Sequence, residues 1–172
     1  MTLILTTAIS WLLAAVFAQA LWHKTRNYLE FTGILKQYRL LPDWSLSVAA
    51  PLLVLIEAVI SAGLLFTATR KEAQGLACLV LLAYAAAMSV NLIRGRREID
   101  CGCGGPPTPL NEWLVVRNLV LAGAGTWLAS VSAKGLDAAS TLIALGTALL
   151  LIVLYVTANQ LIANLPYTRR VA

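Results

Sequence analysis

The sequence has few charged residues, few cysteines and a single histidine. Only 12% of its 172 residues are charged, whereas 59% are hydrophobic, and the mean hydropathy is +0.78. Soluble domains carry about 25% charged residues, so this composition excludes an ordinary soluble domain and indicates a membrane protein. The net charge of +5 does not indicate nucleic-acid binding, because the basic residues lie between apolar runs and form no single stripe.

The three cysteines are too few for a disulfide scaffold and leave room for one pair and one spare residue. Cys101 and Cys103 form the pair. Cys78 lies among Leu, Ala and Val, where a cysteine usually acts as a small core residue. The single histidine, His23, is not held near the pair by any sequence spacing, so we assign no metal ligands.

Five apolar runs are long enough to cross a hydrocarbon core of roughly 30 Å as helices. We therefore expect an all-α polytopic transmembrane helical bundle, a single integral membrane domain over residues 1–172. The first run resembles a signal peptide, but no Lys or Arg precedes it, and we expect a retained helix. Residues 28–41 mix apolar and basic side chains and predict a short interfacial helix. The spans are expected near residues 3–22, 46–67, 75–93, 113–131 and 138–162.

The basic residues predict the orientation of these spans. The links at residues 23–45, 94–112 and 164–172 carry nine Lys and Arg residues. The N-terminus and the links at 69–74 and 132–137 carry three. Because cytoplasmic links carry the excess of positive charge, the cysteine pair is expected on the cytoplasmic side.

Two spans contain ionisable residues, which are costly in a membrane and normally face protein or a water cavity. Glu57 lies midway along the second run, and Arg117 lies one turn inside the fourth, next to Asn118. Glu57 could carry protons, pair with a basic group such as Arg117, or accept a hydrogen bond from a neighbouring hydroxyl or amide. Residues 70–72 are expected to form a short turn.

The most polar and least regular stretch, residues 91–107, contains the motif Cys101-Gly102-Cys103. A disulfide across so short a spacing is strained, and strained, exposed disulfides are typically catalytic rather than structural. Gly102 supplies the backbone freedom that such a ring needs. In the G-G-P-P sequence at 104–107, the two glycines make the backbone flexible and the two prolines make it stiff. This arrangement would present the thiols at a surface.

Three arginines, Arg94, Arg96 and Arg97, precede the cysteines. A nearby cation favours the thiolate, which is the nucleophile in disulfide exchange. From the residues alone we favour redox chemistry at the pair. Two alternatives stay open: an ordinary polar turn, and a metal site, because thiolate pairs suit copper(I) or zinc.

Three motifs, N-L-I-R-G-R at 91–96, I-D-C-G-C-G-G at 99–105 and R-N-L at 117–119, resemble the methylamine utilisation protein MauE family. The similarity extends over the whole chain in length and span pattern, and the D-C-G-C-G-G core followed by R-N is its specific part. That family is grouped with DoxX-like membrane proteins, which are small helical bundles. The resemblance implies a multi-pass protein of the bacterial inner membrane.

The resemblance also implies a role in maturing the small (beta) subunit of periplasmic methylamine dehydrogenase, which carries a tryptophan tryptophylquinone and many disulfides. The partners would be that subunit and the thioredoxin-like MauD. Cys101 and Cys103 would act as a thiol–disulfide oxidoreductase pair. No cofactor motif is visible, although a quinone would suit a membrane redox protein. The supporting residues expected to shape the loop or position an acceptor are Arg94, Arg96, Arg117, Asn118 and Glu57.

The expected orientation conflicts with the simplest form of this function, since disulfides form on the periplasmic side. The loop would have to fold back and be reached from outside, or the protein would have to relay electrons across the membrane. Two other functions stay open. The protein could be a non-enzymatic assembly or transport factor for the subunit, or a metal-handling membrane protein.

Overall fold

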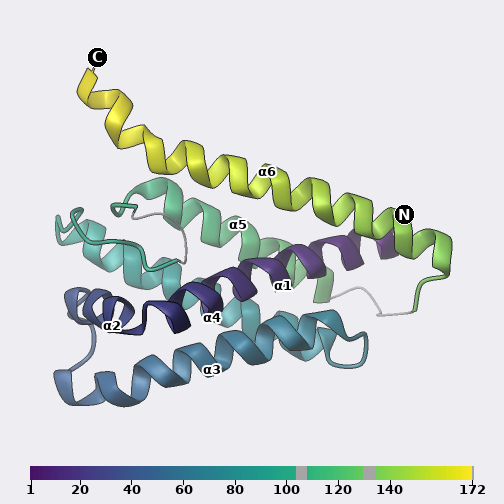
Figure 1. Ribbon diagram of the computed structural model, residues 1–172, viewed down its shortest axis with the longest axis horizontal. Coiled ribbons are helices and arrows are strands. Elements are labelled where there is room, and N and C mark those ends of the chain that lie inside the picture. Colours follow the sequence, from purple (N-terminus) through teal and green to yellow (C-terminus); the bar gives the residue numbers. More distant parts are fainter. Residues whose placement is uncertain (104–107, 130–134, 172) are drawn as a thin grey trace.

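The computed structural model of the protein describes residues 1–103, 108–129 and 135–171. Over these residues the chain forms a bundle of helices (Figure 1). The extended pairing within the described ranges is one isolated antiparallel bridge between Asp100 and Pro109. The helices are α1 (Thr2–Arg26), α2 (Tyr28–Gln37), α3 (Leu46–Leu65), α4 (Arg70–Ile93), α5 (Glu112–Ala129) and α6 (Ala138–Val171), with a 3-10 turn, η1 (Asp43–Ser45), before α3.

The prediction of an all-α membrane bundle of about five spans is confirmed. Four helical segments are long and apolar enough to cross a membrane: Thr2–Arg26, Asp43–Leu65, Arg70–Ile93 and Ala138–Asn164. The fourth predicted run coincides with α5, which packs along α4. Long apolar helices suit a bilayer because a helix satisfies its backbone hydrogen bonds internally.

One predicted boundary is wrong: residues 70–72, expected to form a turn, belong to the first turn of α4. The last apolar span, Ala138–Asn164, agrees with the predicted 138–162, while the helix α6 itself continues to Val171. The reason is that charged residues end an apolar run without ending the helical backbone hydrogen bonds. The G-G-P-P step at 104–107 and Lys134 of the charge count lie outside the described residues.

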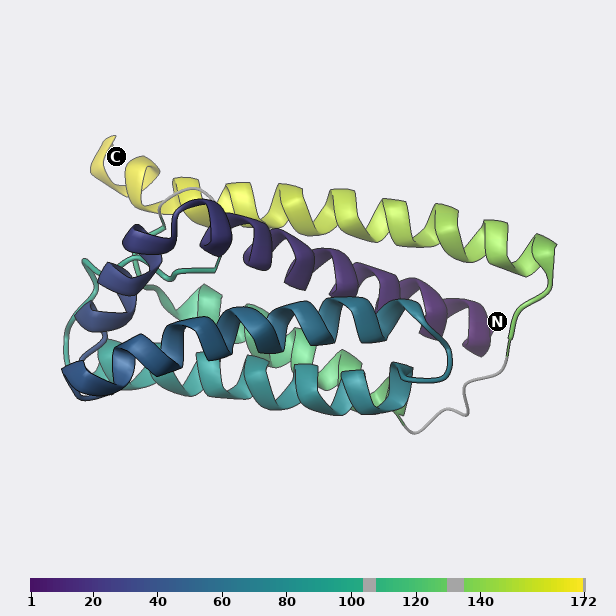
Figure 2. The ribbon, with the colours of Figure 1, turned by 60° about the horizontal axis from the view of Figure 1, so that its bottom comes forward.

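The links fall into two sets at opposite ends of the bundle (Figure 2). Helix α2, the segment that follows α4 and the C-terminal end of α6 lie at one end. The N-terminus of α1, the α3–α4 turn and the start of α6 lie at the other. The links that carry most of the Lys and Arg residues therefore share one end, which is the end that holds the cysteine pair.

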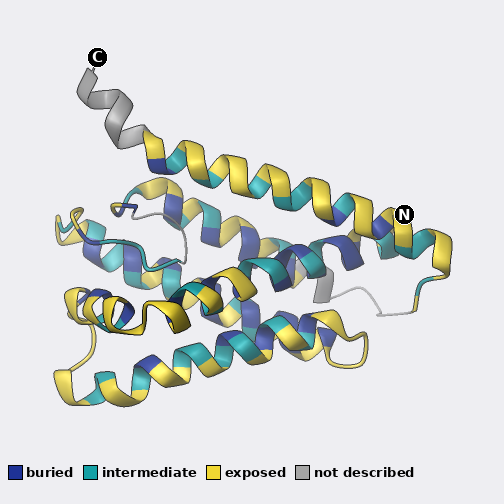
Figure 3. Cartoon of the chain, in the orientation of Figure 1, coloured by how far each residue is buried: buried dark blue, intermediate teal, exposed yellow. Residues whose placement is uncertain are grey.

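The core lies between α1, α3, α4 and α5. Its buried side chains include Leu13 and Phe17 of α1, Ile60 of α3, Leu81 of α4 and Leu121 of α5. The outer faces of α3 and α6 are largely exposed (Figure 3), and many of the exposed side chains there are Leu, Ile and Val. Such a continuous apolar exterior suits contact with lipid.

Polar side chains also tie α1 to α4 near the end of the bundle opposite the cysteines. Arg70 Nη1 donates a hydrogen bond to Thr7 Oγ1 at 3.1 Å. Gln74 Nε2 donates to Ser10 Oγ at 3.0 Å. All four side chains are buried, so these bonds satisfy groups that would be costly to bury alone.

Helices α3 and α4 come close together at Gly63. A Cβ atom at this position would lie 2.9 Å from the Cβ of Ala73, which is shorter than a van der Waals contact. The Gly63 carbonyl also accepts a hydrogen bond from Thr69 Oγ1 at 2.9 Å. Glycine is therefore required here by space.

We expect Gly63→Ala to lower the free energy of unfolding by about 1–3 kcal/mol, as overpacking of a tight contact does. Gly75→Ala is the matched control, because a Cβ at Gly75 meets no atom within 4 Å, and alanine favours a helix by up to about 1 kcal/mol over glycine. Thermal unfolding in detergent measures both variants. A Gly63→Ala protein as stable as the Gly75→Ala protein would contradict the close approach.

Candidate functional site

The cysteine loop is held in shape by the carboxylate of Asp100. Its Oδ1 accepts a hydrogen bond from the Gly102 amide at 2.7 Å, and its Oδ2 accepts one from the Thr108 amide at 2.6 Å. The Cys101 amide in turn donates to the Thr108 carbonyl at 3.1 Å. Asp100 thereby joins the two arms of the loop on either side of residues 104–107.

Gly102 occupies the left-handed region of backbone space, with φ of +66°. Side chains with a Cβ rarely adopt this conformation. A Cβ at this position would also lie 3.3 Å from Cγ2 of Ile34. The turn between the two cysteines therefore depends on glycine.

Apolar side chains anchor the loop to the bundle. Ile99 and Leu110 are buried together with Ile34 of α2, Met88 of α4 and Leu114 of α5. Cys101 and Cys103 pack against this cluster and are only partly buried. The pair is thus set into the end of the bundle, with both residues still partly exposed.

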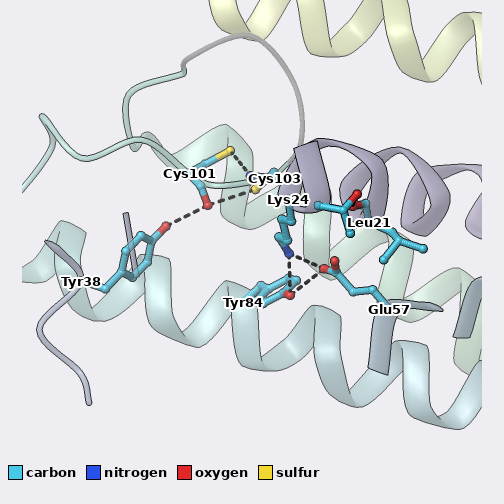
Figure 4. Close-up of polar contacts among 8 residues, drawn as sticks. Leu21, Lys24, Tyr38, Glu57, Tyr84, Cys101 and Cys103 are labelled. Atoms are coloured by element: carbon cyan, nitrogen blue, oxygen red, sulfur yellow. Dashed lines mark hydrogen bonds and ion pairs between the residues drawn. The ribbon is translucent and has the colours of Figure 1, made fainter. Parts of the chain in front are cut away.

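Both cysteines are free thiols, and each sulfur contacts the backbone of the other residue (Figure 4). The Cys103 amide donates to Cys101 Sγ at 3.2 Å, and Cys103 Sγ donates to the Cys101 carbonyl at 3.5 Å. That carbonyl also accepts a hydrogen bond from the Tyr38 hydroxyl at 3.2 Å. Burial raises the pKa of Tyr38, so its hydroxyl remains a donor.

The cysteines have different pKa values. A side-chain hydrogen bond from the Cys101 thiol and the positive charges of Arg117 and Lys24 lower the pKa of Cys103 to about 6, although burial acts in the opposite direction. The hydrogen bond with Cys103 and burial raise the pKa of Cys101. The first proton therefore leaves Cys103, and near neutral pH the pair consists of one thiolate and one thiol.

A buried ion pair lies close to the thiols. Lys24 of α1 and Glu57 of α3 form a salt bridge in which neither side chain is appreciably exposed. The Tyr84 hydroxyl of α4 donates to Glu57 Oε1 at 2.7 Å and accepts from Lys24 Nζ at 2.9 Å (Figure 4). The Lys24 ammonium also lies 5.0 Å from the ring centroid of Phe31, a favourable cation–π contact.

Two small cavities are lined by the cysteines and by nearby charged side chains. One of about 20 Å³ is lined by Lys24, Glu57, Tyr84, Cys103 and Arg117, among others. Another of about 50 Å³ is lined by both cysteines, Arg117, Tyr155 and Asn159. Cys103 therefore shares a space with two cationic side chains from different helices.

The structure corrects which arginines act on the thiols. Arg96 donates to Asn91 Oδ1 at 3.1 Å and to the Tyr38 carbonyl at 3.4 Å, so it fixes the base of the loop. Arg97 pairs on the surface with Glu112 at 2.5 Å, and Arg94 is exposed after α4. The cations that influence Cys103 are instead Arg117 and Lys24.

Three other predicted residues are also located. Glu57 is paired with Lys24 and not with Arg117; Arg117 Nη1 donates to Asn159 Oδ1 at 3.0 Å. Asn118 is buried and donates to the Leu114 carbonyl of its own helix at 2.8 Å. It lines the 20 Å³ cavity beside Cys103 and Arg117.

Sequence reasoning missed Lys24, Asp100 and Tyr38. Lys24 was counted only as a topology signal, and nothing in its neighbourhood indicates burial. Asp100 could have been found, because an aspartate two residues before a glycine often bonds its own backbone in a turn. Among the described residues no group of three or more His, Cys, Asp and Glu side chains could hold a metal ion.

The comparison with known proteins agrees with the loop motif. The sequence profile described as "Methylamine utilisation protein MauE" matches residues 2–131. The chain belongs to the methylamine utilisation protein MauE family. It is 42% identical to the "Methylamine utilization protein MauE" of Paracoccus denitrificans over 74% of this chain and 67% of that protein.

A second relative shows that the similarity extends into α6 of this chain. The protein of the same name from Methylophilus methylotrophus is 34% identical over 91% of this chain and 84% of its own length. No solved structure matches the chain. The family name connects the chain with methylamine utilisation, and the structure adds a membrane bundle with a partly buried dithiol.

The low pKa of Cys103 can be tested by alkylation. In a reduced Cys78→Ser protein, iodoacetamide should modify Cys103 before Cys101, with a rate that rises as pH passes through about 6. Arg117→Gln should move this midpoint to higher pH, because the thiolate loses a stabilising charge. Mass spectrometry of digested protein follows each site separately.

The matched control is Arg94→Gln, which removes a cation of the same type from an exposed position. It should leave the midpoint unchanged. Preferential alkylation of Cys101, or an equal shift in both arginine variants, would show that Arg117 does not set the thiolate.

The buried ion pair gives a further prediction. Lys24→Met leaves the Glu57 carboxylate buried without its cation, and breaking a buried pair costs about 3–5 kcal/mol. Lys24→Met combined with Glu57→Gln should recover much of that loss in thermal unfolding. If the double variant were as unstable as Lys24→Met alone, lost packing and not the unpaired charge would be responsible.

Proposed function

We propose that the protein acts in the maturation of the small (beta) subunit of methylamine dehydrogenase, by thiol–disulfide exchange at Cys101 and Cys103. The observation that carries the proposal is the state of the pair. Two free thiols lie two residues apart in one turn, and one of them has a pKa lowered to about 6. Membership in a methylamine utilisation family supplies the context.

The exchange begins with the Cys103 thiolate, which attacks one sulfur of a partner disulfide. A mixed disulfide forms, and the partner's other sulfur leaves as a thiolate. Cys101 then gives up its proton and attacks Cys103 Sγ, which forms the Cys101–Cys103 bond and releases the partner as a dithiol. In the reverse direction, a partner thiolate attacks the Cys101–Cys103 disulfide. The partner then leaves with a new disulfide, and the pair is reduced.

The surrounding groups suit this cycle. Arg117 and Lys24 stabilise the Cys103 thiolate, which is both the attacking group and the leaving group of the mixed disulfide. Tyr38 holds the Cys101 carbonyl, and Asp100 holds the amide after Cys101. The turn can therefore keep its shape while the two sulfurs change partners.

The proposed partners are the dehydrogenase small subunit and the thioredoxin-like MauD, and the proposed location is the bacterial inner membrane. The support for this location is the apolar bundle with its basic links at one end. Positive charge assigns that end to the cytoplasm, whereas the disulfides of the subunit form in the periplasm. The pair would then be reached through the bundle or would pass electrons across it.

Single serine variants test the exchange. In a host whose growth on methylamine depends on this chain, Cys101→Ser and Cys103→Ser should each abolish active dehydrogenase. Cys101→Ser should also accumulate a mixed disulfide on Cys103, because the resolving thiol is missing. Cys103→Ser should accumulate none, since it lacks the attacking thiolate.

Cys78→Ser is the matched control, because Cys78 packs partly buried against the apolar core. It should support normal growth. The mixed disulfide is detected on non-reducing gels and identified by mass spectrometry. Normal dehydrogenase maturation in a Cys101→Ser, Cys103→Ser double variant would exclude exchange and favour a non-enzymatic assembly or transport factor.

A further inference from the structure

A third cavity, much larger than the other two, lies beside the cysteine pair. It measures about 270 Å³ and is bounded by α2, α4 and the cysteine loop. Its lining is mainly apolar and includes Ile34, Leu35, Leu53 and Met88. Leu40 and Leu41 also line it and are 41% and 42% exposed, so apolar side chains on the exterior of the bundle border it. We call this space the apolar cavity.

The size of the apolar cavity restricts its occupant. An engineered apolar cavity of roughly 150 Å³ holds one benzene molecule. A space of about 270 Å³ therefore admits a single substituted ring, but no element of a folded protein. The rings of Phe31, Tyr38 and Tyr84 stand in its lining, and aromatic side chains favour stacking or edge contacts with another ring.

The apolar cavity also contains polar groups suited to one kind of ring. Lys24 reaches it from α1, and two of the three N–H bonds of its ammonium are directed at Glu57 and Tyr84. The third can donate to a carbonyl oxygen. Cys101 and Cys103 line the same cavity, so a ring that carries carbonyl groups would meet a dithiol and a hydrogen-bond donor together.

We propose that the apolar cavity binds the ring of a membrane quinone and that this quinone oxidises the Cys101–Cys103 pair. This inference rests on the proposed exchange function and supplies its electron acceptor. A quinone has an apolar ring with two carbonyl oxygens and partitions into the bilayer. It can reach the site whichever side of the membrane the loop occupies.

The reaction balances with the groups present. The Cys103 thiolate and the Cys101 thiol lose two electrons and one proton and form one S–S bond. The quinone takes up these two electrons, that proton and one further proton, and leaves as the quinol. The Lys24 ammonium is placed to donate the further proton to a carbonyl oxygen, and water restores it afterwards.

The test uses the full-length Cys78→Ser protein, reduced, freed of reductant and held in nanodiscs without oxygen. The probe is ubiquinone-1, whose fully substituted ring has no open position for permanent addition of a thiol. We expect one quinol to form for each Cys101–Cys103 disulfide. Quinone absorbance and mass spectrometry measure the two products, and Cys103→Ser should form neither.

Ala87→Leu should fill part of the apolar cavity, which Ala87 lines from α4, and should slow oxidation by ubiquinone-1 at least tenfold. Ala86→Leu is the matched control. It makes the same change one residue away, at an exposed position outside the cavity lining, and should leave the rate unchanged.

Oxidation by glutathione disulfide separates this inference from the proposed function. Ala87→Leu should react with glutathione disulfide within twofold of the parent, which shows that the pair is intact; if it does not, Leu41→Trp replaces it as the cavity-filling variant. If the parent Cys78→Ser protein were oxidised by glutathione disulfide but not by ubiquinone-1, the quinone site would be overturned and exchange would stand. Equal quinone rates in Ala87→Leu and Ala86→Leu would also overturn the site. If the parent protein were oxidised by neither compound, exchange would be overturned as well.

Discussion

The buried pair of Lys24 and Glu57 is the interaction on which the arrangement of this end of the bundle depends. Removing two charges from water costs several kcal/mol for each ion, and only good geometry with further hydrogen bonds recovers it. The further partner is the Tyr84 hydroxyl. Because the three residues come from α1, α3 and α4, the pair forms only when these helices have one relative register. That register also sets Lys24 beside Cys103.

The cysteine loop completes the site from the opposite side. Asp100 ties its two arms together through backbone amides, and an apolar cluster fixes it to α2, α4 and α5. The turn between the cysteines depends on Gly102, whose backbone conformation few other residues adopt. Charged side chains and cavities surround the pair held in this turn.

The charges also explain why two neighbouring cysteines are not equivalent. Arg117 and Lys24 act on Cys103, whereas Cys101 is engaged through its carbonyl with Tyr38. The result is one sulfur whose pKa is lowered and one sulfur whose pKa is raised. Lys24 forms the ion pair with Glu57 and also helps to lower the pKa of Cys103.

The sequence by itself determined the membrane bundle, its five long helices and the cysteine pair, because apolar runs and a C-G-C motif are local features that need no partner to be recognised. It also indicated Glu57 and Arg117 as unusual residues within apolar spans. Only the tertiary structure decided their partners: Glu57 meets Lys24, Arg117 meets Asn159, and the arginines next to the cysteines turn to other groups. The physical reason is that pairing between helices depends on their packing and register, which residues distant in the chain fix together.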